Sequence, residues 1–415
     1  MSIIKSIKIN TIISAVIILG LMLPCTVSNA ATVIPTDTST ASTGCVLVGV
    51  SGSYVSDKQK ALDRINAIRK EACSEGIINP STGSPLTMSD YVPIRWSSDL
   101  EYIAKIRAAE AGIKISHTRP NGDSCFSLTA PNGNQSWGEV LAWNSSSGMI
   151  RGINQWYEEK TDWVNNTGAE TGHYTQMIDP YHTYVGLGAF VSDDIAYGNC
   201  TAGEFSEYPG ESEEFSEPQK DIIQTVEVSK SLLGKAKIKS ASGIDEINAG
   251  GSEQYFLAYT VSSSDATVYS LENIEWTSSD ESVASVDANG LIRYLAPGEA
   301  TICATSPSGE SGSIKLSILP VAPGKVSIKS ISAAKGKLTV KWNSVTDATG
   351  YEICYSTDKY FYNSKSVKVG GNKTSKVIKN LKKKTKYYVM LRAFNKASTG
   401  IAYSEYSKVK SKKTK

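Results

Sequence analysis

The chain has 415 residues, of which 40% are hydrophobic and 20% are charged, and its formal net charge at pH 7 is +2. At roughly 100–200 residues per domain, this length predicts two to four domains. The composition is typical of a globular protein and excludes a disordered one.

The N-terminal segment, up to Ala30, has the pattern of a secretory signal peptide. Two lysines precede an apolar run at residues 12–23, which is too short for a comfortable transmembrane span. Ser28–Ala30 offers small residues where a signal peptidase cuts, so we expect a secreted chain that begins at Ala31. An uncleaved membrane anchor and a lipoprotein attached through Cys25 are the alternatives. No later segment reaches transmembrane length.

The next part of the chain predicts a domain of mixed helices and strands over residues 57–200. Before it, residues 31–56 are rich in Ser, Thr and Gly and are expected to form a flexible leader. Apolar spacing predicts three helices, at residues 57–73, 97–111 and 146–163. Strand-like segments follow at 173–178 and 185–191. This mixture indicates an α/β or α+β domain.

The chain beyond residue 200 changes in pattern and in charge. Residues 201–223 are acidic and contain Ser and Pro, so we expect a linker there. Alternating apolar residues then predict two β-sandwiches, at 224–319 and 322–412. From residue 321 to 415 there are 22 basic residues against four acidic ones. We expect this part to bind an anionic cell-wall polymer or polysaccharide, with nucleic acid less favoured, although solvated strand faces would give the same pattern.

Six cysteines lie outside the signal, at positions 45, 73, 125, 200, 303 and 354. Export permits disulfides, but six scattered cysteines do not form a disulfide scaffold. We favour a Cys125–Cys200 disulfide, because both residues lie in loop-like stretches of one domain. Cys303 and Cys354 are expected to be buried free thiols.

Four short segments within residues 57–200 resemble motifs of the CAP superfamily (cysteine-rich secretory, antigen 5 and pathogenesis-related proteins). In chain order they are Ser116–Gly122, Gly138–Ala142, Trp156–Glu159 and Gly172–Ile178. Two positions depart from the pattern: Asp179 stands where many members have Trp, and Val140 replaces the usual Asn. Neither change removes a titratable residue.

The resemblance implies an α–β–α sandwich in which four side chains face one open cleft: His117, Glu139, Glu159 and His173. In that superfamily the paired histidines can hold a divalent metal, and several members bind sterols or other lipids. We expect Trp156, Tyr174 and Gln176 to contribute to binding. Spacing alone leaves Glu158 open as an alternative to Glu159.

The two C-terminal segments also resemble known domains. Residues 225–319 resemble a bacterial Ig-like domain of group 2, on the strength of the Trp276–Asp280 and Val283–Asp287 segments. Residues 322–412 resemble a fibronectin type III domain, with Trp342 and the Tyr387–Ala393 segment in place.

The residues themselves favour a metal site as well. The chain has only three histidines, and two of them, His117 and His173, lie in the motif segments. Neutral imidazole is a good zinc or copper ligand, and nearby carboxylates can orient it. We therefore expect one weakly bound divalent metal, most simply zinc, with Glu139 and Glu159 as orienting groups or general bases. His182 is expected to be a surface residue.

Three functions fit these patterns. The chain could be a secreted, cell-wall-associated protein that binds a lipid, a wall component or a host molecule. It could be a metal-dependent hydrolase, since catalytic zinc sites use sets such as two histidines and one glutamate. It could also be a purely structural surface protein. No His-Glu-x-x-His motif is present, which argues against the hydrolase. No Gly-x-Ser-x-Gly motif is present, so covalent acyl transfer has no support.

Overall fold

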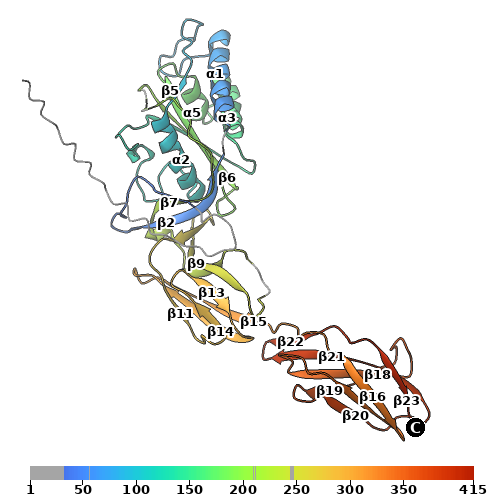
Figure 1. The fold of residues 1–415 in the computed structure, drawn as a ribbon. Helices are drawn as coiled ribbons and strands as arrows, with labels where there is room; N and C mark the ends of the chain where they lie inside the picture. Colours follow the sequence, from blue (N-terminus) through green and yellow to red (C-terminus); the bar gives the residue numbers. More distant parts are fainter. Residues whose placement is uncertain (1–31, 56, 209, 211, 244–246) are drawn as a thin grey trace, which may run out of the picture.

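The computed structural model describes residues 32–415 apart from 56, 209, 211 and 244–246, and the expected signal peptide lies outside these residues. Figure 1 shows an N-terminal domain with helices on both sides of a sheet, a middle β-sandwich against it, and a C-terminal sandwich at the far end. Among the described residues, no helix has both the length and the apolar character to cross a membrane.

The N-terminal domain is a three-layer α–β–α sandwich. Its helices are α1 (Lys58–Glu75), α2 (Ser98–Ile113), α3 (Met149–Glu158), α4 (Lys160–Asn165) and α5 (Gly172–Ile178). Its main strands are β2 (Cys45–Tyr54), β4 (Gly138–Asn144), β5 (Tyr184–Val191), β6 (Asn199–Ser206) and β7 (Gln219–Ser229), with short β1 (Thr32–Ile34) and β3 (Arg95–Trp96). The predicted fold class is confirmed for this domain.

The central strands are buried on both faces, so helices must cover each side of the sheet. All residues of β6, and all but the last of β5, are buried. One core joins α2 to one face of the sheet, and a second core joins α1, α3 and α5 to the other. Gly186 and Gly188 let α2 lie directly on β5. A Cβ atom at these positions would lie 2.0 Å from the Glu101 nitrogen and 2.5 Å from the Ala104 oxygen, respectively.

The helix predictions were correct for α1 and α2 and wrong in two other places. The expected third helix is divided at Glu159 into α3 and α4. The segment from His173 to Ile178, predicted as a strand, belongs to helix α5.

The predicted flexible leader is wrong, because half of its residues lie in strands β1 and β2. Strand β2 pairs with β7 over almost its whole length, and Val48 and Val50 are buried. The expected acidic linker at 201–223 is wrong at both ends, since β6 extends to Ser206 and β7 begins at Gln219. Both errors have one cause: β2 and β7 pair although they lie far apart in the sequence, and local composition does not reveal such a partner.

The middle domain continues the same sheet. Its strands are β8 (Lys237–Ser240), β9 (Ser252–Thr260), β10 (Thr267–Ser270), β11 (Glu275–Ser278), β12 (Ala284–Val286), β13 (Leu291–Tyr294), β14 (Gly298–Thr305) and β15 (Ser311–Ile318). Strand β10 pairs with β2 at Gly49 and Val48. One hydrophobic core runs from β2 and α2 to β15, so these two domains share both a sheet and a core.

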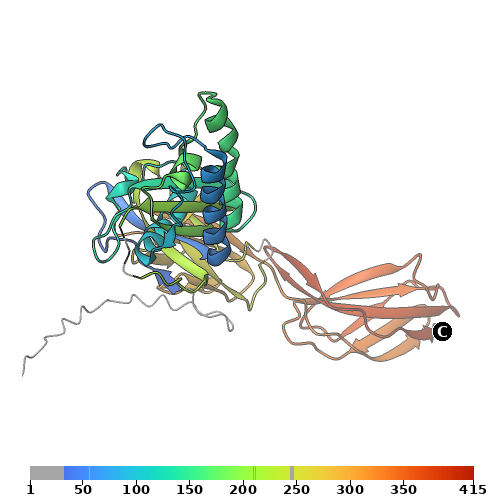
Figure 2. The same ribbon diagram turned by 90° about the horizontal axis from the view of Figure 1, so that it is seen from above.

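The C-terminal domain is a separate sandwich with its own core. One sheet holds β16 (Ile328–Ala334), β17 (Lys337–Trp342) and β20 (Ser375–Ile378). The other holds β18 (Gly350–Ser356), β19 (Lys365–Gly370), β21 (Lys386–Ala397), β22 (Gly400–Tyr403) and β23 (Lys410–Lys413). Figure 2 shows this domain extending away from the other two.

The six cysteines of the described chain are free thiols. The Cys125–Cys200 disulfide prediction is therefore wrong. Both residues are buried, and burial raises the pKa of the Cys200 thiol beyond its ordinary range.

Candidate functional site

The four titratable residues of the motif segments come from four different elements. His117 lies in the loop after α2, and Glu139 is the second residue of β4. Glu159 lies at the junction of α3 and α4, and His173 lies in the first turn of α5. The structure brings the two imidazoles together, with ring centroids 6.1 Å apart and an interplanar angle of 25°. We call His117 and His173 the histidine pair.

Each ring of the pair is held at Nδ1 by a carboxylate. Nδ1 of His117 lies 2.7 Å from Glu139 Oε1, and Nδ1 of His173 lies 2.5 Å from Glu159 Oε1. The His117 side chain is 53% exposed and that of His173 is 27% exposed. No hydrogen bond from the described part of the chain reaches Nε2 of either ring. With carboxylates accepting at Nδ1, the bare Nε2 of each neutral ring is available as a ligand atom.

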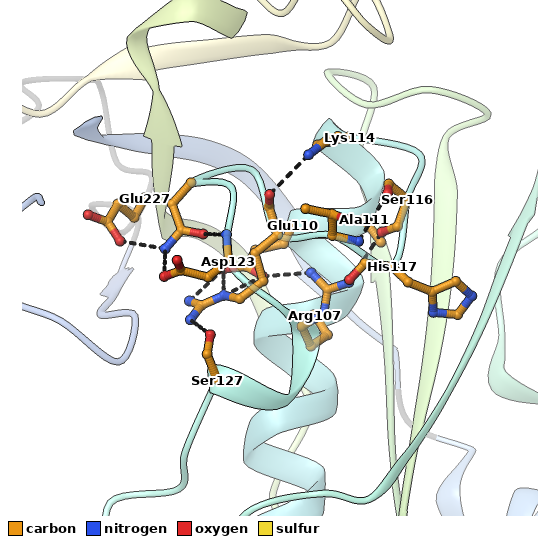
Figure 3. Close-up of polar contacts among 12 residues, drawn as sticks. Arg107, Glu110, Ala111, Lys114, Ser116, His117, Asp123, Ser127 and Glu227 are labelled. Atoms are coloured by element: carbon orange, nitrogen blue, oxygen red, sulfur yellow. Dashed lines mark hydrogen bonds and ion pairs between the residues drawn. The ribbon is translucent and has the colours of Figure 1, made fainter. Parts of the chain in front are cut away.

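Behind Glu139 stands a fully buried arginine of α2. Arg107 Nε donates to Glu139 Oε2 at 2.5 Å, and Arg107 Nη1 donates to Glu110 Oε2 at 2.7 Å. Its remaining nitrogen, Nη2, donates to the carbonyl oxygen of His117 at 3.2 Å. One guanidinium therefore orients both the Glu139 carboxylate and the backbone of the histidine loop. Figure 3 shows Arg107 and Glu110 beside the loop that carries His117.

The network continues away from the histidines through a second arginine. Arg119 Nη2 donates to Glu110 Oε1 at 2.9 Å and to Asp37 Oδ1 at 2.8 Å. Farther along the same loop, Asn121 Nδ2 donates to Glu227 Oε2 at 2.8 Å. Asp37 precedes β2 and Glu227 lies on β7, so the loop that carries His117 is tied to the ribbon these strands form (Figure 3).

The buried charges fix the protonation of the His117 side. Burial alone would raise the pKa of Glu139, but the hydrogen bond from His117 and the charge of Arg107 outweigh it, so this pKa is lowered. For Asp37 burial is likewise outweighed, by the hydrogen bond and charge of Arg119, and its pKa is also lowered. Both carboxyl groups are therefore ionised at neutral pH.

The His173 side is built from a short stretch of chain. Glu159 Oε2 accepts from the backbone N–H groups of His173 and Tyr174, at 3.0 and 3.1 Å. These are unpaired donors at the start of helix α5, and a carboxylate satisfies them well. Glu159 thus caps the helix with one oxygen and orients the His173 ring with the other. Glu158, the alternative left open by spacing, is not in this contact.

The sequence did not point to Glu204, which lies directly opposite Glu139 in the β4–β6 register. It is 1% exposed, and its Oε2 accepts from Ser136 Oγ at 2.5 Å. Its Oε1 has no hydrogen-bond partner among the described residues. Burial, and next the charge of Glu139, raise the pKa of Glu204 well above its usual range. A neutral carboxyl group therefore lies behind the ionised Glu139.

Of the other residues expected to bind, Trp156 and Tyr174 are buried in the supporting layers and Gln176 is half-buried. Trp156 is 1% exposed and its Nε1 donates to the Leu141 carbonyl at 2.9 Å. Tyr174 is fully buried, and Gln176 packs against Gly138, where a Cβ would lie 2.2 Å from the Gln176 Oε1. His182 is not the surface residue that was expected. It is half-buried, and its Nδ1 lies 3.1 Å from the Gln176 carbonyl oxygen.

The donor set of the site is not that of a closed metal site. Across the described residues, no group of three or more His, Cys, Asp and Glu side chains is arranged to hold a metal ion. All four oxygens of Glu139 and Glu159 already accept hydrogen bonds. The two Nε2 atoms remain, and two ligands leave a zinc ion to complete its coordination with water or ligand oxygens.

Comparison with known proteins identifies three regions of the chain. Residues 62–205 match the cysteine-rich secretory protein family (CAP), residues 247–317 match the bacterial Ig-like domain (group 2), and residues 321–410 match the fibronectin type III domain. The matches follow the order expected from the sequence. Asp37 and Glu227, which support the His117 loop, lie outside the CAP match.

Individual relatives resemble only parts of the chain. Human contactin-6 is 32% identical over 153 residues, which are 32% of this chain and 14% of contactin-6. Venom allergen 5 of Polybia paulista is 26% identical over 164 residues, covering 37% of this chain and 74% of the allergen. A solved fibronectin type III domain of human contactin 1 is 24% identical, covers 23% of this chain and 76% of that one, and has a TM-score of 0.19. The chain therefore spans about a seventh of the contactin-6 length.

Proposed function

Because the chain carries a CAP domain, a group 2 bacterial Ig-like domain and a fibronectin type III domain in that order, we propose that it is an extracellular binding protein whose ligand site is the histidine pair. His117 and His173 would hold one divalent cation, most simply zinc, through their Nε2 atoms. The ligand would supply oxygen donors to that cation.

One observation carries this proposal: both imidazoles are fixed at Nδ1 by glutamates, neither Nε2 has a hydrogen-bond partner among the described residues, and both side chains are partly exposed. A carboxylate at the second nitrogen sets the ring orientation and makes the ring a better metal ligand. Side chains held in place before binding lose little further entropy when the ligand arrives. When bound, the cation would polarise the oxygen that it contacts.

The same contacts favour binding over hydrolysis. A metal-dependent hydrolase needs a general base within hydrogen-bond reach of the attacking water. Both oxygens of Glu139 are taken by Arg107 and His117, and both oxygens of Glu159 are taken by the His173 ring and the start of α5. Each of these oxygens already accepts a hydrogen bond, which stabilises the carboxylate and makes both glutamates weaker general bases.

Calorimetry with zinc on the full secreted chain tests the proposal. We expect one weakly bound zinc ion, whose affinity falls as the pH drops below about 6.5, because only neutral imidazole coordinates. His117→Ala and His173→Ala should each weaken binding by at least about tenfold, the loss of one of two protein ligands.

His182→Gln is the matched control, because this half-buried third histidine contacts the Gln176 carbonyl and not the pair. Zinc affinity that is unchanged in both alanine variants would place the metal elsewhere. Turnover of an ester or peptide by the zinc-loaded chain, lost in both variants, would instead favour the hydrolase.

A further inference from the structure

The fibronectin type III domain carries a concentration of lysines at the pole farthest from the Ig-like domain, where the C-terminus lies in Figure 1. Three segments make up this surface, which we call the lysine pole: residues 334–337, residues 379–386 and residues 412–415. They are the β16–β17 turn, the β20–β21 loop with the start of β21, and the end of the chain.

Backbone hydrogen bonds hold the three segments together. The Lys415 nitrogen donates to the Ala334 carbonyl at 3.2 Å, and the Leu381 nitrogen donates to the Gly336 carbonyl at 3.0 Å. Thr414 is buried between Lys382 and Thr385, since its hydroxyl donates to the Lys382 carbonyl at 2.7 Å and its N–H donates to the Thr385 carbonyl at 3.0 Å. Segments that are far apart in the sequence therefore form one fixed surface.

The pole holds ten exposed lysines and no acidic residue. They are Lys335, Lys337, Lys379, Lys382, Lys383, Lys384, Lys386, Lys412, Lys413 and Lys415. No ion pair between described residues includes any of them. Of the four acidic residues of the domain, Glu352 is paired with Arg392 and Glu405 with Lys325.

Such a gathering of like charge repels itself and is not neutralised within the domain. It therefore favours a partner that brings many negative charges at once. The lysine ammonium group is a hydrated point charge. It lacks the planar guanidinium with which arginine binds a single carboxylate or phosphate through two parallel hydrogen bonds. Ten lysines on one pole thus suit a flexible polymer with a repeated charge better than a single small anion.

The composition of the pole also argues against other polyanions. The three segments contain no aromatic residue. Beside them Tyr387 is buried, and Tyr388 is half-buried with the Lys386 ammonium 5.2 Å from its ring centroid, so the pole has no exposed row of rings on which the bases of single-stranded nucleic acid could stack. Their one large apolar residue, Leu381, packs against the core of the domain and is not free to insert into a membrane.

We propose that the lysine pole binds an extracellular polymer of repeated phosphodiester groups on the cell wall. The interaction is independent of the histidine pair, because α5, which carries His173, lies in the domain at the other end of the molecule (Figure 1). Attachment through the pole leaves the CAP domain projecting from the surface to which the chain is bound.

Sedimentation of the full chain with purified cell wall tests this inference. One wall sample keeps its phosphodiester polymer, and a second has the polymer removed with hydrofluoric acid. We expect retention on the intact wall at about 50 mM salt, release at about 500 mM because exposed charges are screened, and little retention on the stripped wall.

Two matched variants localise the effect within one domain. The triple variant Lys382→Gln, Lys383→Gln and Lys384→Gln removes three charges from the pole. The control variant Lys329→Gln, Lys341→Gln and Lys373→Gln removes three exposed charges outside it. We expect on the order of tenfold weaker retention for the first variant, because each lost phosphate contact lowers the affinity, and less than about twofold for the second.

Equal retention of the two variants would overturn the inference, as would equal retention on stripped wall. Stronger retention on anionic vesicles or on double-stranded DNA than on intact wall, at equal negative charge, would overturn it in favour of those partners. Zinc calorimetry of the pole variant should match the unmodified chain. The inference and the proposed function can therefore fail separately.

Discussion

His117 and His173 are each oriented by one glutamate, but the supports behind the two glutamates differ. Behind Glu139 lies a run of buried ion pairs that passes through two arginines and ends at Asp37, before β2. Behind Glu159 lie only two backbone N–H groups at the start of α5. One side of the pair is a network across the fold, and the other is a helix cap.

This difference predicts which changes in the chain will release His117 and which will release His173. The His117 side needs residues from position 37 to position 227, and these meet only when β2 and β7 pair. The His173 side needs little more than residues 159–174. We therefore expect damage outside the CAP match to release His117 while leaving His173 in place, and the predictions below test that asymmetry.

The largest effect should come from cutting the chain close to the limits of the CAP match, which spans residues 62–205. A fragment of residues 57–205 lacks β2, β7 and Asp37, which exposes one edge of the shared core. We expect it to lose most of the roughly 5–15 kcal/mol that stabilises a folded domain and to unfold without a cooperative transition. A fragment of residues 32–320 should melt cooperatively. Calorimetry measures the unfolding transition of each fragment. Equally sharp transitions in the two fragments would contradict a core shared by the first two domains.

Arg107→Met should produce the next largest loss. It leaves Glu139 buried without its arginine and leaves Glu110 with Arg119 as its remaining cation, and breaking a buried ion pair in this way costs about 3–5 kcal/mol. Glu159→Gln on the other side should cost about 1 kcal/mol, the value of one helix cap. Denaturant unfolding measures both. Similar losses of unfolding free energy in the two variants would contradict the expected difference between the His117 and His173 sides.

Asp37→Asn should have a smaller effect that depends on pH. The pKa of Asp37 is lowered in the folded chain, so the Asp37 carboxylate stabilises the fold above its unfolded pKa of about 3.9, and this stability is lost as the pH falls through the folded value. We expect a loss of about 1–2 kcal/mol at pH 7, since the variant keeps one hydrogen-bond acceptor for Arg119, and a weaker acid dependence.

Hydrogen exchange supplies the local readout for Asp37→Asn. Amides of residues 114–124 should exchange faster in the variant, while those of residues 159–174 should not change. Glu253→Gln, on the middle domain, is the control that removes a carboxylate far from this loop. Equal exchange changes in both segments would mean that the variant loosens the whole domain and not the His117 loop.

Glu204→Gln should have the smallest effect, with the opposite sign. The pKa of Glu204 is raised in the folded chain, so its contribution is fully present below the unfolded pKa of about 4.3 and is lost as the pH rises through the folded value. Glutamine stays neutral and avoids that loss. We expect the variant to be about 1 kcal/mol more stable than the unmodified chain at pH 8 and no more stable at pH 4. Unfolding at the two pH values measures this, and a loss of stability at pH 8 would contradict a neutral Glu204.

The sequence was informative where the signal was local. His117, Glu139, Glu159 and His173 lie in short motifs, so these residues could be picked out from the sequence. Helices α1 and α2 have clear apolar spacing, so their positions could be predicted. The roles of Asp37 and Glu227 could not be predicted, because these residues meet Arg119 and Asn121 across 82 and 106 residues of chain, respectively. The segment Cys45–Val50 can be recognised as a strand only when its pairing partner, β7, is known. Helix α5 was mistaken for a strand because its first turn is capped by Glu159, 14 residues earlier.

X-ray absorption at the zinc edge of the zinc-loaded full chain tests the central claim most directly, because it counts the ligands of the bound ion. We predict two imidazole nitrogens at about 2.0–2.1 Å with the remaining ligands oxygen, and one imidazole fewer in either His117→Ala or His173→Ala. Sulfur at about 2.3 Å, or an unchanged imidazole count in both variants, would contradict a metal held between His117 and His173.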